Sequence, residues 1–171
     1  CKVRYWDPAW QEIVYAYLGK VLDLVDAYEY WGPGGAGSPD QPTAESDMVR
    51  FVQDIANYAR VTKNRPDFQV FVQNAAELSS HPDYVEAVSG IGKEDLFYNG
   101  NRRRPADEVD WSVGQLDRFE AAGKPILVTD YVTRRARIND FYQKARSHGY
   151  VPYATRRDLD VLTTYPGEGP G

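Results

Sequence analysis

The alternation of strand-like and helix-like segments is the feature that most constrains the fold of this chain. Four segments are predicted to be strands, because they combine β-branched or aromatic residues with polar or turn-forming ends: 68–73, 95–100, 125–132 and 150–155. Apolar residues at helical spacing precede or separate them, over about 44–60, 111–122 and 136–147. Because parallel neighbours need a crossover that is usually a helix, the sequence predicts an α/β fold with parallel strands in chain order and helices on the outer face.

The number of these units indicates part of a larger barrel. A complete (β/α)8 barrel, or TIM barrel, takes about 250 residues, whereas this chain has 171. We therefore predict a partial TIM barrel of C-terminal units over residues 1–162, with an amphipathic helix that begins after Asp7. Residues 163–171 are rich in Gly and Pro and are predicted to form a tail. An incomplete barrel leaves open sheet edges, through which we expect self-association.

Composition excludes several classes of partner and cofactor. The net charge is −5 and the acidic and basic residues are interspersed, so no basic stripe suits nucleic acid. The apolar stretches are far shorter than the roughly 20 residues that cross a bilayer, so we expect no membrane span. The chain has one cysteine and two histidines, without zinc-like spacing. It also lacks phosphate-loop and dinucleotide motifs, so we expect neither a metal nor an organic cofactor.

Carboxylates at the ends of the predicted elements are the candidates for chemistry. Asp23, Asp26, Glu77 and Asp130 each fall just after a predicted helix or strand. The carboxyl ends of parallel strands share one mouth in a barrel, and active sites lie there. Two carboxyl groups that flank a glycosidic bond can cleave it, one as the acid and the other as nucleophile or base. Tyrosines near these acids suit the binding of sugar rings.

Several segments resemble glycoside hydrolase family 114, a TIM-barrel family typified by endo-α-1,4-polygalactosaminidase. They are KVRYWDPAWQ, LVDAYEYW, FVQNAAEL, GIGKEDLFYNG, LVTDYV and YVPYATRRDLDVL. The resemblance implies an extracellular or cell-envelope glycosidase that degrades a galactosamine-containing polysaccharide. It implies Glu77 and Asp23 as the catalytic pair. It further implies that the substrate is bound by Asp26, Tyr28, Asn74, Tyr98, Asp130 and Tyr131.

The chain departs from the family pattern in two places. The segment KVLD runs directly into LVDAYEYW, where family members have an additional strand, and the first three βα units are absent. We therefore expect Asp23 to follow the first helix instead of ending a strand. The alternative function is that of a non-catalytic, carbohydrate-binding relative. In either case we expect Asn74, Glu77, Tyr98 and Asp130 to gather at one end of the sheet and face a common cleft.

Overall fold

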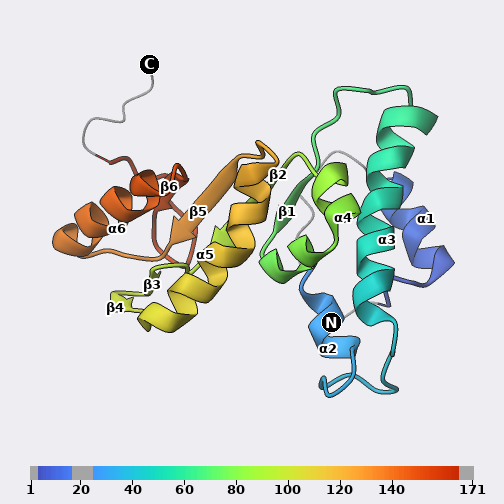
Figure 1. Ribbon diagram of the computed structural model, residues 1–171, viewed down its shortest axis with the longest axis horizontal. Coiled ribbons are helices and arrows are strands. Elements are labelled where there is room, and N and C mark those ends of the chain that lie inside the picture. The colour runs from blue at the N-terminus through green and yellow to red at the C-terminus, as the bar shows by residue number, and fades with distance from the viewer. Residues whose placement is uncertain (1–3, 17–24, 166–171) are drawn as a thin grey trace.

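The computed structural model describes residues 4–16 and 25–165 and contains a four-stranded sheet at its centre (Figure 1). The strands are β1 (Phe71–Gln73), β2 (Gly90–Glu94), β5 (Ile126–Asp130) and β6 (Val151–Ala154). They lie in that order and all pair in parallel. A parallel sheet in chain order confirms the predicted partial barrel, because each neighbour is reached by a crossover that includes a helix.

Helices flank this sheet along its whole width. Three of them form one end of the molecule in Figure 1, namely α1 (Pro8–Ala16), α2 (Ala27–Trp31) and α3 (Ala44–Asn57). The others follow the strands: η2 (Ala76–Ser80), α4 (Pro82–Ala87), α5 (Ala106–Ala121) and α6 (Arg135–Ser147). The predicted helix over 44–60 ends earlier as an α-helix and continues as the π-helical turn η1 (Tyr58–Thr62). None of the helices in the described part is long and apolar enough to cross a membrane.

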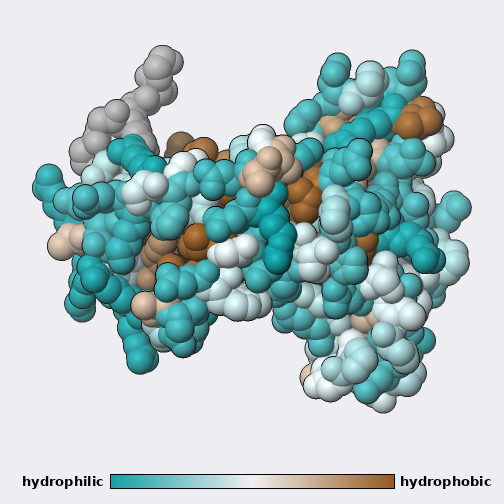
Figure 2. Space-filling model, in the orientation of Figure 1, coloured by the Kyte–Doolittle hydropathy of each residue, from teal (hydrophilic) through white to brown (hydrophobic). Residues whose placement is uncertain are grey.

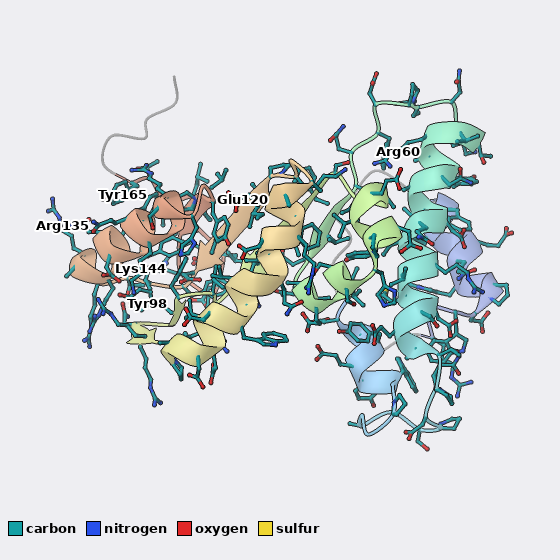
Figure 3. The ribbon with its side chains drawn as sticks, viewed as in Figure 1. Arg60, Tyr98, Glu120, Arg135, Lys144 and Tyr165 are labelled. Atoms are coloured by element: carbon teal, nitrogen blue, oxygen red, sulfur yellow. The ribbon has the colours of Figure 1, made fainter. Side chains whose placement is uncertain are left out.

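Arg60 fixes the end of this helical segment to the chain segments that lead into β1 and β2. Its guanidinium donates hydrogen bonds to the carbonyls of Phe68 and Ala87 and to the hydroxyl of Ser89. Figure 3 shows Arg60 between the end of α3 and the loop that leads to β1. The three bonds hold the segment before β1 against the end of α4 and the segment that follows it.

The prediction of a strand over 95–100 is wrong. The strand lies one segment earlier, at Gly90–Glu94, and the backbone leaves it at Asp95 with a φ of 49°. Tyr98–Asn99 (β3) instead pairs antiparallel with Arg102–Arg103 (β4) in a small separate ribbon. Glycines usually weaken strands, and β2 was not predicted because it contains Gly90 and Gly92. Here they are needed, because a Cβ on Gly90 would lie 2.3 Å from the Phe71 ring.

The two faces of the sheet differ in their environment. Val72, Ile91 and Ile126 are paired across three strands and are at most 4% exposed, as members of the core. The next row contains Leu127 and Val151, which are 39% and 55% exposed. Side chains alternate between the faces of a sheet, so one face packs under the helices and the other is partly open. Figure 2 shows a largely hydrophilic surface with hydrophobic patches near its middle.

Candidate active site

A backbone kink directly after β1 places the predicted catalytic glutamate. Asn74 and Ala75 have φ values of 61° and 52°. Asparagine tolerates this left-handed region, whereas alanine rarely adopts it, so the turn is strained in the way that functional sites often are. The backbone N–H of Asn74 donates to the carbonyl of Gly92 at 2.7 Å, which fixes the kink to β2. The chain then enters η2, where Glu77 lies in the first turn.

A cavity of about 640 Å³ lies where β1 and β2 end, bounded by α2, η2 and the first half of α5. Its lining is strongly acidic. Seven carboxyl side chains line it, from Asp26, Glu29, Glu77, Glu94, Asp95, Asp107 and Glu108. Two cationic side chains, Lys93 and Arg104, and one indole, Trp111, complete the charged and aromatic part of the wall. Such a cavity favours the entry of a cationic ligand.

Glu29 and Glu77 form a carboxyl pair in this cavity. Partial desolvation, a hydrogen bond with Glu77 and the charge of that neighbour raise the pKa of Glu29 to about 7. Two carboxylates in contact repel each other, so the pair retains a proton near neutral pH. A carboxyl group that keeps its proton at neutral pH is what a general acid requires.

Lys93, on β2, is one of the two cationic side chains that line the cavity. Burial lowers the pKa of its ammonium, and the charge of Glu77 opposes that shift. In return, the charge of Lys93 acts to lower the pKa of Glu29, opposite to the effect of Glu77. The protonation of Glu29 therefore depends on the charge of Lys93 as well as on that of Glu77.

Glu94, the last residue of β2, is the centre of a second polar cluster. Asn74 Nδ2 donates to Glu94 Oε2, and Asn74 Oδ1 accepts the Glu94 backbone N–H, both at 3.0 Å. The hydroxyl of Tyr131 donates to Glu94 Oε1. Burial acts to raise the pKa of Glu94, but the hydrogen bonds from Tyr131, Asn74 and Gln73 together lower it. Glu94 is thus held as a carboxylate acceptor.

The structure brings some of the predicted site residues together. Asp26, Asn74 and Glu77 line the cavity. Tyr28 lies near the two glutamates of the cavity. Burial raises the pKa of its phenol, and the charges of Glu77 and Glu29 raise it further. Tyr131 reaches the cavity through its bond to Glu94. Asp23, the predicted partner of Glu77, lies outside the described residues.

Asp130 and Tyr98 are not part of the cavity lining. Asp130 is fully buried, and its carboxylate accepts hydrogen bonds from the backbone N–H groups of Leu96, Phe97 and Tyr98 at 2.8–3.0 Å. The Tyr98 hydroxyl donates to Asp140 on α6, and Figure 3 shows Tyr98 close to Lys144. The expected common cleft therefore contains Asn74 and Glu77, while Asp130 and Tyr98 support the loop after β2.

Sequence reasoning missed Glu29, Lys93 and Glu94. Glu29 follows Asp26 by three residues, and positions i and i+3 share a helix face, so the sequence could have placed Glu29 beside Asp26. Lys93 and Glu94 are the last two residues of β2 (Gly90–Glu94), a strand that the sequence did not predict. Within the described residues, no group of three or more His, Cys, Asp or Glu side chains is arranged to hold a metal ion.

Comparison with solved structures places the fold among glycoside hydrolase domains. The glycoside hydrolase domain of PelA from Pseudomonas aeruginosa superposes with a TM-score of 0.68 at 21% sequence identity, covering 91% of this chain and 63% of that one. A variant of the same domain, with one glutamate replaced by alanine, gives a TM-score of 0.67. At this identity the likeness defines the fold alone, which is a partial TIM barrel.

The sequence identifies the family within that class. Residues 15–170 match the profile of glycoside hydrolase family GH114, and the chain belongs to this family. Uncharacterized proteins of Methanocaldococcus jannaschii and Thermotoga maritima are both 34% identical to it, over 95% and 93% of this chain. The chain spans about half the length of these curated relatives, 52% and 54%.

Proposed function

We propose that this protein is a glycosidase that cleaves O-glycosidic bonds in a galactosamine-containing polysaccharide by means of a carboxylate pair. Glu77 is one member of the pair. The observation that carries the proposal is its position, just after a strained turn at the end of β1 and in contact with a protonatable Glu29. Membership of family GH114 supports the same reaction class.

The second carboxylate is either Asp23 or Glu29. The resemblance implied Asp23, while the described residues offer Glu29 as a proton donor. Carboxyl groups that cleave a glycosidic bond stand about 5–10 Å apart, so a sugar that enters between Glu29 and Glu77 must break their hydrogen bond. Entry of the sugar would then leave Glu29 protonated on one side of the bond and Glu77 on the other.

The charge of the cavity supports an amino sugar as the substrate. Seven carboxyl groups against two cations leave an excess of negative charge. The free amine of galactosamine is cationic at neutral pH and is attracted to such a site, whereas its N-acetylated form is neutral. We expect binding of the deacetylated polymer to weaken as salt is added, because salt screens these charges.

Substitution of the three acids tests the proposal. Hydrolysis of galactosamine polymer is measured as released reducing ends, and polymer binding is measured separately by calorimetry. Glu77→Gln should lower hydrolysis by at least about 100-fold while binding remains, because the change removes a proton donor or acceptor and little volume. Of Glu29→Gln and Asp23→Asn, the variant with the larger loss in kcat identifies the partner. Full activity of Glu77→Gln would refute the assignment.

A carbohydrate-binding protein without catalysis is the second candidate. The hydrogen bond between Glu29 and Glu77 favours it, since a carboxyl pair in contact is too close to flank a glycosidic bond. In that case the unchanged chain binds the polymer and releases no reducing ends. A polymer too large to cross a membrane is met outside the cell, so both functions fit an extracellular or cell-envelope location.

A further inference from the structure

The first half of α5 forms one wall of the acidic cavity and carries an exposed tryptophan. Ser112 of this wall is buried, whereas the Trp111 side chain next to it is 56% exposed. The later turns of α5 contribute Leu116 and Phe119 to the core, both fully buried. Trp111 therefore lies on the half of α5 that borders the cavity, before the turns that pack in the core.

The exposure of this indole is unusual within the molecule. Among the large hydrophobic side chains that are exposed in the described residues, Trp111 is the one that lines the acidic cavity. Trp31 is 8% exposed and packs against Trp6 with ring centroids 5.6 Å apart. An indole that is left half in water at the wall of a cavity, instead of packed in the core, is available to a ligand.

The neighbours of Trp111 define what that ligand would carry. Asp107 and Glu108 precede it by four and three residues, which places all three on the same side of α5. All three line the cavity. Glu108 also pairs with Arg104 at 2.5 Å, which fixes its carboxylate beside the cavity wall. The wall thus combines a flat apolar surface with negative charge.

We propose that Trp111 is a stacking platform for a second sugar unit, and that Asp107 and Glu108 bind the ammonium group of that unit. The inference rests on the proposed function and extends it from one sugar to a chain of sugars. The C–H face of a pyranose packs on an aromatic ring, and an ammonium group over an indole gains cation–π attraction. The subsite increases affinity for long oligomers over short ones.

Binding of galactosamine oligomers to the unchanged chain and its variants tests this subsite. Trp111→Ala should weaken binding of long oligomers about tenfold, the scale of a buried Trp contact, and should reduce the preference for long over short oligomers by the same factor. Trp111→Phe keeps an aromatic face and should lose no more than about threefold. Val61→Ala is the matched control, because Val61 is 70% exposed on η1 and is not a lining residue of the cavity.

Three outcomes separate this inference from the proposed function. Equal affinities of the unchanged chain and Trp111→Ala for long oligomers, with binding intact, overturn the subsite and leave the proposed function standing. An equal loss for short and long oligomers also overturns it, because Trp111 would then act on the first sugar or on the fold. If the unchanged chain binds no galactosamine oligomer, the proposed function fails and the subsite fails with it.

Discussion

The carboxylate of Asp130 organises the segment that follows β2. It accepts three backbone N–H groups from consecutive residues, Leu96, Phe97 and Tyr98, in a place without exposure to water. Burial raises the pKa of Asp130 to about 6 although these hydrogen bonds favour the charged form. The residue was predicted to bind substrate, but its oxygens are already occupied by the backbone.

We expect Asp130→Asn to destabilise the fold by about 1–3 kcal/mol at neutral pH, because the amide can no longer accept all three N–H groups. Urea unfolding measures this as a lower midpoint at an unchanged m-value. Asp160→Asn is a suitable control, since its exposed carboxylate pairs with Arg156 in a surface salt bridge. A midpoint of Asp130→Asn equal to that of the unchanged chain would contradict the structural role.

The raised pKa of Glu29 predicts a pH-dependent stability. Its folded pKa is about 7, against 4.5 for the free group, so between these values the folded state holds a proton that the unfolded state has released. The contribution of Glu29 to stability therefore falls as pH rises from 4.5 to 7 and is constant above that. Glu29→Gln should remove this part of the slope in thermal melts. Parallel melting curves for Glu29→Gln and Glu86→Gln, an exposed control on α4, would argue against the pair.

Single residues show what a sequence can and cannot predict about this site. Asn74 and Glu77 were predicted to lie at the mouth of the sheet, where the cavity is, because they follow a recognisable strand and strand ends share one edge of a parallel sheet. Asp130 met the same criterion, yet its carboxylate faces the backbone of a loop whose path depends on tertiary packing. Glu29 is brought to Glu77 from a helix about fifty residues earlier, and no local pattern encodes such a meeting.

At the scale of elements, three of the four strands of the sheet were predicted near their observed positions, whereas the helix predicted over 111–122 begins earlier, at Ala106. The apolar periodicity over 44–60 and 136–147 located α3 and α6 closely, because a helix face is encoded by local spacing. β2 was missed because its sequence, GIGKE, has two glycines and little β propensity. These glycines allow β1 to approach, which is a requirement of the pairing between strands and not of β2 alone.

Two alanine substitutions in β2 should separate rigid from adaptable contacts. A Cβ on Gly90 would meet the Phe71 ring at 2.3 Å and the Pro125 carbonyl at 2.8 Å, so we expect Gly90→Ala to cost about 1–3 kcal/mol. A Cβ on Gly92 would meet mainly the amide of Gln73, at 2.1 Å, and that flexible end can move aside. Chemical unfolding should rank Gly90→Ala as the less stable variant. The reverse order would mean that Gln73, through its bond to Glu94, is fixed more firmly than Phe71.

At the scale of the whole molecule, the sheet is open at both sides. Within the described residues β1 and β6 are the outer strands, and the chain matches only 63% of the PelA domain that shares its fold. An outer strand presents unpaired N–H and C=O groups that can join another chain. Leu127 and Val151 add apolar surface on the open face, next to β6.

We propose that the chain self-associates through the open face of the sheet and its outer strand β6, as expected from its incomplete barrel. Sedimentation velocity should show a mass that rises with concentration, because association removes apolar surface and strand edges from water. Leu127→Glu with Val151→Glu should shift the equilibrium toward the monomer, since charge on the open face opposes the contact between copies. Val61→Glu adds a charge at an exposed position on η1, in a different part of the fold, and should leave the equilibrium unchanged. A monomer at all concentrations, or an equal effect of the control, would show that the open face is not a contact surface.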